Sequence, residues 1–158
     1  MLNWYLQSGK ESDVVLSTRI RMARNLSDVP FIHHMNKNDI ETVLQKLESI
    51  TPSIGYGLKF LRLSNMDNIT KLSLIEKHLI SPEFAVDKEK KGAILINDEE
   101  NICIMINEED HIRLQVLQAG LELENTLEQA IEIDEKLAKM LNFAFSEKFH
   151  ILQFRFHC

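Results

Sequence analysis

The residues best suited to chemistry are the adjacent acids Glu108, Glu109 and Asp110, which are followed by His111 and Arg113 and come directly after an apolar run. Neighbouring carboxylates repel one another by roughly 1 kcal/mol per close pair in water, and by more where water is excluded. A divalent ion, a cationic substrate or the nearby arginine can compensate this charge. An exposed loop of solvated charges is the structural alternative, and it is the commoner arrangement for a generic acidic triplet.

A cationic segment lies upstream, around Arg19 and Arg21. The alternation with Ile20 places both arginines on one face of a strand, about 7 Å apart, a spacing that suits successive phosphate groups. A solvated face with weak surface ion pairs explains the same pattern about equally well. Ser17 adds a hydroxyl to this face, but no His or Asp pattern marks it as a nucleophile.

Other chemistry has little support in the sequence. His78 lies at the expected end of a helix, where a partly positive imidazole meets the helix dipole, and position alone favours that structural role. No glycine-rich loop of the Walker type occurs. The cysteines, Cys103 and Cys158, are too few for a disulfide framework and have no zinc-site spacing.

Composition favours one globular domain. The chain has 158 residues, of which 44% are hydrophobic and 27% are charged. A formal net charge of -6 argues against general nucleic-acid affinity, so phosphate binding would need a local arginine cluster. We find neither a leader nor an apolar run long enough for a bilayer, and therefore expect no membrane association and a cytoplasmic location.

Hydrophobic periodicity predicts several strands. In the first of them, Val14, Leu16, Ile20 and Met22 share the apolar face. Two apolar runs around a polar turn indicate an antiparallel hairpin, and the second run is apolar on both faces, which places it in the sheet interior. The predicted strands are residues 13–22, 58–63, 92–96, 102–106 and 112–120.

Helical spacing predicts helices at 36–52, 68–78 and 123–141. The first is capped by Asn36 and stopped by Pro52. Residues 84–91 are expected to form a mobile loop. The second helix should turn an apolar row inward and be closed by Ser81 and Pro82; that row is Ile69, Leu72, Ile75 and Leu79. Together these elements predict an α+β fold, a mostly antiparallel sheet with helices packed on it.

Three segments, Val15–Arg21, Glu76–Pro82 and Ile106–Arg113, resemble the ATP:guanido phosphotransferase family in residues, order and spacing. Within that family the chain looks closest to the bacterial protein arginine kinases. The resemblance covers roughly residues 12–149. It implies an incomplete guanido-kinase catalytic domain that moves the γ-phosphoryl group of ATP onto the guanidinium of arginine residues in proteins.

The resemblance also implies roles for single residues. Glu109 would bind and activate the acceptor guanidinium, supported by Glu108 and Asp110. His78 would lie beside the base or ribose of ATP. Mg²⁺ would be bound through the phosphates of ATP, without a protein cage. The residues implied to line the phosphates are Ser17, Thr18, Arg19, Ile20 and Arg21, with the two arginines foremost, together with Arg113.

Residues 150–158 depart from the family pattern, which predicts a truncated, single partial domain with a divergent tail. The implied partners are ATP, arginine-containing protein substrates and an activator protein, whereas the oligomeric state stays open. Because further arginines of the family cage would lie beyond this tail, we expect weak or no activity from residues 1–158 alone. The alternative is a non-catalytic fragment that binds nucleotide or a partner protein through the same surface.

Overall fold

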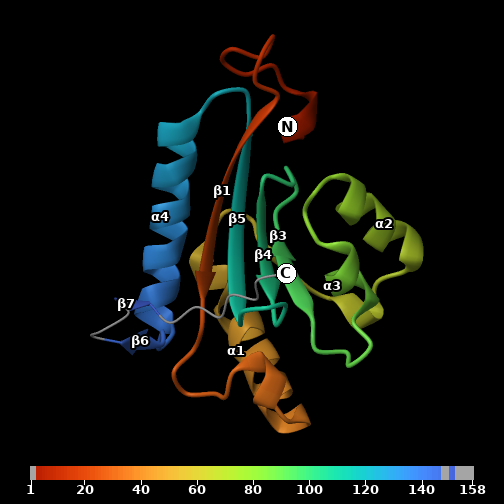
Figure 1. The fold of residues 1–158 in the computed structure, drawn as a ribbon, viewed down its shortest axis with the longest axis vertical. Coiled ribbons are helices and arrows are strands. Elements are labelled where there is room, and N and C mark those ends of the chain that lie inside the picture. The colour runs from red at the N-terminus through yellow and green to blue at the C-terminus, as the bar shows by residue number, and fades with distance from the viewer. Residues whose placement is uncertain (1–2, 147–149, 152–158) are drawn as a thin grey trace.

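A five-stranded antiparallel sheet forms the centre of the computed structural model, which describes residues 3–146 and 150–151 (Figure 1). The strand order is β1-β5-β4-β3-β2. All neighbouring strands pair antiparallel, so the predicted hairpin and the mostly antiparallel sheet are confirmed. The strands are β1 (Ser17–Arg24), β2 (Lys59–Arg62), β3 (Ala93–Ile96), β4 (Ile102–Ile106) and β5 (Ile112–Ala119).

Helices cover both faces of this sheet (Figure 1). The helices are α1 (Lys37–Ile54), α2 (Asn68–Glu76), α3 (Pro82–Val86) and α4 (Leu123–Met140). Short 3-10 turns occur at Trp4–Leu6, Ile32–His34 and Leu63–Asn65, and a small ribbon pairs β6 (Phe145–Ser146) with β7 (His150–Ile151). The α+β fold class is therefore confirmed. Within residues 3–146 and 150–151, none of the helices has the length and apolar character needed to cross a bilayer.

The first face of the sheet packs on α1 and α4. Leu47 of α1 and Ile133 of α4 are fully buried against Leu114 of β5 and Ile104 of β4, which belong to the same core. Every residue of β4 is buried, as its two apolar faces predict for a strand in the middle of the sheet. Each large side chain removed from water here contributes roughly 1.5–3 kcal/mol to the hydrophobic stabilisation.

The second face packs on α2 and α3. Leu74 of α2 and Phe84 of α3 lie in one core with Ile94 of β3 and Met105 of β4. Leu117 is the β5 residue in this core, and β1 contributes no buried residue to it within the described chain. The two short helices therefore cover the β3–β4 half of this face and leave most of the β1–β5 half uncovered by helices.

The start of α1 matches its prediction, but its end does not. Asn36 accepts hydrogen bonds from the backbone N–H groups of Asn38 and Asp39, and the Asp39 carboxylate accepts one from the Asn36 N–H, which completes a capping box. Pro52 was expected to stop the helix, yet the helix continues to Ile54. A proline this near the carboxyl end removes one intrahelical hydrogen bond, and burial of Ile54 offsets that loss.

The inward row predicted for the second helix is half right, because Leu79 is buried in the second core and Ile75 packs against it, whereas Ile69 and Leu72 do not. Ile69 is 81% exposed and Leu72 is 59% exposed, whereas Leu74 is the buried residue of α2. The helix also ends at Glu76, two residues before its predicted end. Several apolar rows fit helical spacing in so short a segment, so packing, and not periodicity, selects the buried one.

Three further local predictions need correction. Ser81 does not close a helix but begins α3, because its hydroxyl accepts a hydrogen bond from the Phe84 N–H at 3.1 Å. The segment expected as a mobile loop from residue 84 is helical as far as Val86. At the first strand, Val14 and Leu16 are 80% and 86% exposed and precede β1, so they do not share its apolar face.

Candidate functional site

A pocket of about 830 Å³ opens on the uncovered half of the second sheet face. Its wall is formed by β1, the end of α2 with the α2–α3 connection, α3 with the loop after it, β4 with the loop that leads to β5, and β5 itself. Its charged and titratable lining residues include Arg19, Arg21, His78, Glu108, Glu109 and Arg113. The cationic strand and the acidic cluster, about 90 residues apart in sequence, therefore face one cavity.

Strand register explains why the arginines meet. In the antiparallel pairing of β1 with β5, Arg21 lies opposite Gln115 and Ala23 lies opposite Arg113. Directly paired residues point to the same face of a sheet. Arg19 lies two residues before Arg21 on β1, so it points to that face as well. Neither Arg19 nor Arg21 makes an ion pair with a carboxylate in the part of the chain that the structure describes. Both side chains are exposed, so their charge is available to an anion in the pocket.

Arg113 is held by all three acids of the cluster. Its Nη1 lies 2.7 Å from Glu108 Oε2, and its Nη2 lies 2.6 Å from Glu109 Oε2 and 3.1 Å from Asp110 Oδ2. The side chain is only 16% exposed. Burial by itself lowers the pKa of Arg113, but the surrounding carboxylates outweigh burial, so the pKa of Arg113 is raised. The acids thus compensate a buried cation instead of repelling one another in water.

The adjacent glutamates differ in exposure. Glu108 is 12% exposed, and its Oε1 accepts a hydrogen bond from Ser81 Oγ at 3.0 Å. Burial raises the pKa of Glu108, and the opposing attraction of Arg113 is smaller. The side chain of Glu109 is 52% exposed. Glu109 is therefore the carboxylate of this pair that a molecule in the pocket can reach.

Asp110 lies beneath the pocket and does not line it. Its side chain is fully buried, its Oδ1 accepts a hydrogen bond from Asn25 Nδ2 at 2.8 Å, and its Oδ2 accepts one from Arg113. This position suits orientation of the Arg113 guanidinium, not direct contact with a ligand.

His78 enters the pocket from the connection after α2. The helix ends in a Schellman arrangement, in which the N–H of Leu79 donates to the Leu74 carbonyl and the N–H of His78 donates to the Ile75 carbonyl. His78 itself has a positive φ of 58°. The residue thus lies past the helix end, and its side chain lines the pocket instead of only capping the helix dipole.

Three residues expected near the phosphates lie elsewhere. Thr18 is buried on the opposite sheet face, where its hydroxyl donates to the Gly120 carbonyl at 2.7 Å and accepts from the Glu122 N–H at 2.9 Å. Ile20 packs against the first core. Ser17 is exposed at the start of β1, and the lining of the pocket in the described chain does not include it.

One residue close to the site was not singled out from the sequence. Gln115 is fully buried under the pocket floor and contacts both Arg21 and the His78 backbone. The only sequence signal was its place on the polar side of β5, in alternation with Leu114 and Val116. Ordinary alternation does not distinguish such a residue from a solvated glutamine.

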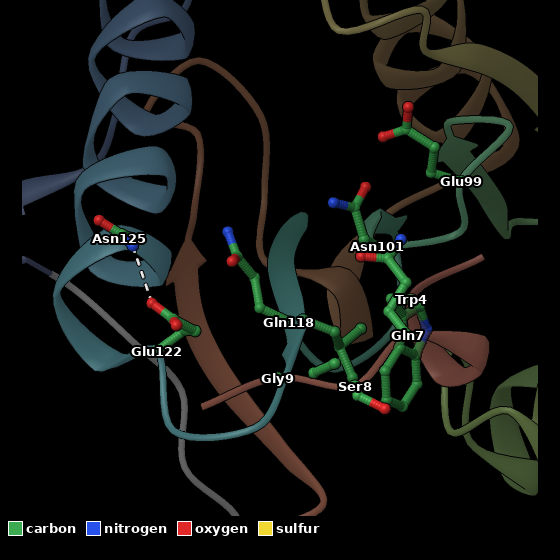
Figure 2. Close-up of a pocket in the computed structure, with 11 residues that line it drawn as sticks. Trp4, Gln7, Ser8, Gly9, Glu99, Asn101, Gln118, Glu122 and Asn125 are labelled. Atoms are coloured by element: carbon green, nitrogen blue, oxygen red, sulfur yellow. Dashed lines mark hydrogen bonds between the residues drawn. The ribbon is translucent and has the colours of Figure 1, made fainter. Parts of the chain in front are cut away.

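A second, smaller pocket of about 470 Å³ lies beside the N-terminal segment, and Figure 2 shows its lining. The side chains of Trp4, Glu99, Asn101 and Glu122 surround it, and Asn125 Nδ2 donates to Glu122 Oε2 at 2.8 Å. None of the residues singled out from the sequence lines this cavity. We therefore assign the candidate site to the larger pocket.

The larger pocket suits a polyanion together with a cationic group. Exposed guanidinium groups favour phosphates through paired, charge-assisted hydrogen bonds, and an accessible carboxylate favours a second guanidinium or an ammonium. In the part of the chain that the structure describes, no group of three or more His, Cys, Asp or Glu residues is arranged to hold a metal ion.

Comparison with known proteins yields a match to one family. The sequence profile described as ATP:guanido phosphotransferase, C-terminal catalytic domain, matches residues 37–157. This range extends past Phe149 into the segment expected to diverge. Part of that segment lies outside the described residues, and the divergent tail at 150–158 stays a prediction.

Curated relatives and solved structures agree with this match. The Protein-arginine kinase of Halothermothrix orenii is 44% identical over 151 residues, and that of Listeria welshimeri is 40% identical over 150 residues. Each alignment covers 95% of this chain but 43% and 42% of the relative, so the chain spans about two fifths of their length.

Among solved structures, the duplicated taurocyamine kinase from Schistosoma mansoni with bound transition state analog components is 25% identical, with a TM-score of 0.82 over 89% of this chain and 21% of that one. Lombricine kinase has a TM-score of 0.75 at 20% identity, over 96% of this chain and 45% of that one, which is a likeness of fold.

Proposed function

Because the chain belongs to the ATP:guanido phosphotransferase family, we propose that it forms part of a kinase that transfers the γ-phosphoryl group of ATP to arginine side chains of proteins. The name Protein-arginine kinase, which similar bacterial proteins carry, supports this substrate. The observation that carries the proposal is the convergence of Arg19, Arg21 and Arg113 with Glu109 around one pocket. We also propose that residues 1–158 act as a single partial catalytic domain.

The arginines are assigned to the nucleotide phosphates. Phosphoryl transfer relies on positioning and on stabilising the charge of the transferred group, since the protein itself forms no covalent bond. Arg19 and Arg21 are exposed toward the pocket and lack carboxylate ion partners among the described residues, which supports their availability to a triphosphate. Arg113 approaches from the neighbouring strand β5, where the buried Asp110 helps to fix its orientation.

Glu109 is assigned to the acceptor. Its half-exposed carboxylate already binds one guanidinium, that of Arg113, which supports its fitness for the planar guanidinium of a substrate arginine. In the proposed reaction a substrate guanidinium nitrogen forms a bond to the γ-phosphorus, and the bond from that phosphorus to the β–γ bridging oxygen breaks. ADP leaves with the electron pair of the broken bond, and Glu109 accepts the proton that the nitrogen loses.

His78, which also lines the pocket, is assigned to the base or ribose of ATP. The place of His78 past the end of α2, in the lining of the same pocket as the arginines, supports this assignment. Mg²⁺ would supply charge neutralisation and would be carried by the phosphates of ATP, as is common where Mg²⁺ binds together with a nucleotide.

Phosphotransfer to protein provides the direct test. The chain is incubated with γ-labelled ATP, Mg²⁺ and an arginine-rich protein, and acid-labile phosphoarginine is quantified. We expect transfer above a protein-free blank, even if weak, and loss of that transfer in Glu109→Gln with ATP binding retained. The control is Glu99→Gln, a glutamate of the smaller pocket, which should behave like the unaltered chain.

Two results would contradict the proposal. Phosphoryl transfer that persists in Glu109→Gln would show that Glu109 is not the proton acceptor. ATP binding without any phosphoarginine would instead support a nucleotide-binding fragment without catalysis. Calorimetric titration of ATP and of tripolyphosphate on the same preparations separates these results, because it measures binding independently of turnover.

A further inference from the structure

We propose that Gln115 is a positioning residue that joins the phosphate-facing arginine of β1 to the loop that carries His78, so that both halves of the nucleotide site are aligned by one buried amide. The proposal rests on the function proposed above. It concerns a residue that lies under the pocket and would not touch the nucleotide.

The side-chain amide of Gln115 makes one hydrogen bond through its oxygen and one through its nitrogen. Its Oε1 accepts a hydrogen bond from Arg21 Nε at 3.0 Å, and its Nε2 donates one to the His78 carbonyl at 2.8 Å. The residue has 0% exposure. Since a buried polar group without partners is costly, the amide is held in this orientation by the two bonds together.

The first bond prepares Arg21 for phosphate. A guanidinium has five donors, and anchoring Nε from below leaves the outer Nη1 and Nη2 groups as a fork that points away from the anchor. Burial lowers the pKa of Arg21, and the nearby charges of Arg19 and Arg113 lower it further, so incoming anionic charge would relieve this repulsion. An Arg21 side chain that is already held in place loses less conformational entropy on binding phosphate than a freely moving arginine does.

The second bond holds the loop. The next carbonyl, that of Leu79, is contacted by the Cys103 thiol at 3.5 Å, and Cys103 lies opposite Gln115 in the β4–β5 pairing. Burial raises the pKa of Cys103 to about 12, which keeps the thiol protonated and able to donate. Two successive carbonyls, those of His78 and Leu79, are therefore tied to the sheet from below, directly after the point where the His78 side chain leaves the backbone.

A side-chain amide of this length meets two geometric requirements at once. An acceptor must face Arg21 while a donor faces the His78 carbonyl, and a carboxylate offers no donor at neutral pH. Gln115→Met keeps the shape but removes both bonds. Gln115→Glu keeps the acceptor and turns a negative charge toward the carbonyl.

A double-mutant cycle on ATP binding tests the link. We expect Gln115→Met to weaken ATP binding about tenfold, the loss typical of a hydrogen bond to a charged group. In an Arg21→Ala background the same change should weaken binding less than about threefold, because its main target is gone. Gln118→Met is the matched control, since Gln118 lies on the same strand but faces away from the pocket, toward Gln129. It should bind ATP like the unaltered chain.

The outcomes separate this proposal from the function on which it rests. Failure of the unaltered chain to bind ATP or tripolyphosphate overturns both. Normal ATP affinity in Gln115→Met, or an equal loss with and without Arg21, overturns the positioning role alone. If Gln115→Met does not fold, a measurement on the unaltered chain tests the link instead. The NMR signal of the Arg21 Nε–H group is assigned by its absence in Arg21→Lys. This signal should be protected from exchange with water, and rapid exchange would overturn the link.

Discussion

At the scale of single residues, Arg113 joins the acidic cluster to the pocket. Its guanidinium touches Glu108, Glu109 and Asp110, and the deepest of these acids is also fixed by Asn25. Removing one partner from a buried ion pair costs far more than the pair contributes in water, because the remaining charge stays buried and uncompensated. The cluster that could act on a substrate is therefore also a structural unit.

Asp110→Ala should lower the free energy of unfolding by about 3 kcal/mol, since it removes the most deeply buried of the carboxylates that compensate Arg113 and also the acceptor of the Asn25 Nδ2 hydrogen bond. Urea denaturation measures this loss. Asp98→Ala is the control, because Asp98 pairs with Lys59 at the surface and is 80% exposed, so its removal should leave the stability nearly unchanged. Similar losses in the two variants would refute a buried ion-pair role for Asp110.

His111 is a second buried residue of the same segment, and its contacts define its protonation state. The Leu26 N–H donates to Nδ1 at 3.0 Å, and Nε2 lies 2.8 Å from the Pro30 carbonyl. A carbonyl only accepts, so Nε2 carries the proton and the ring is neutral. Burial lowers the pKa of His111 from its ordinary value of 6.5, against the smaller effects of the Pro30 carbonyl and Asp110.

The neutral ring predicts acid sensitivity. Below pH 6.5 the unfolded chain takes up a proton at His111 that the folded chain resists, so the stability that this residue contributes is full above that pH and declines as pH falls through it. His111→Gln should flatten the loss of stability between about pH 7.5 and pH 5.5, measured by urea unfolding. His34→Gln, at an exposed position, should keep the original slope. An unchanged slope in His111→Gln would contradict the assignment.

At the scale of secondary structure elements, prediction succeeded where burial is nearly continuous. The strands from 92 to 120 and the long helix α4 follow apolar patterns that one sheet face or one helix face imposes over many residues. Prediction was poorer for the two short helices. The buried face of α2 was only partly identified, and α3 was not predicted, because so few turns carry too little periodicity to choose a buried face. Their docking is decided by the second core.

The N-terminal segment is attached to the turn after β5 by a close backbone approach. Leu121 N–H donates to the Lys10 carbonyl at 2.7 Å. Gly120 has a φ of +71°, and a Cβ at this position would lie 2.4 Å from the Lys10 oxygen. Only a residue without a side chain permits this contact and this backbone conformation together.

Gly120→Ala should displace the N-terminal segment and cost at least about 2 kcal/mol, because backbone strain and a backbone clash add together. Gly57→Ala is the matched control: its φ is +66°, and nothing lies within 4 Å of the place that a Cβ would occupy, so only strain of about 1 kcal/mol is expected. Urea unfolding measures both changes. Emission of Trp4, the single tryptophan, should shift in Gly120→Ala alone, and a shift in neither variant would oppose the proposed attachment.

At the scale of the whole molecule, the sheet separates packing from chemistry. One face is covered by α1 and α4 (Figure 1). The other face is divided between the second core and the larger pocket. The pocket depends on pairing between β1 and β5, which joins residues as far apart as Arg21 and Gln115. Because the site is assembled by this long-range pairing, a ligand bound in the pocket should raise the free energy of unfolding of the entire fold.

ATP at about 100 times its dissociation constant should raise the free energy of unfolding by about 2.7 kcal/mol, if it binds only the folded chain. Thermal unfolding should then shift upward by roughly 5–10 °C. Adenosine at the same concentration should shift it much less, because it lacks the phosphates that the arginines would bind. Equal shifts with ATP and adenosine would exclude the assigned role of Arg19 and Arg21, and Arg19→Ala should reduce the ATP shift selectively.

The amino-acid sequence by itself determined the α+β class, the central position of β4 and the chemical character of the two charged segments, because these depend on local periodicity and residue type. Only the tertiary structure decided which charged residues share a cavity. Arg19, Arg21, His78, Glu108, Glu109 and Arg113 line it, whereas Thr18 and Ile20 point to the other face. Strand register and burial set that division, and both arise from contacts between residues far apart in the chain.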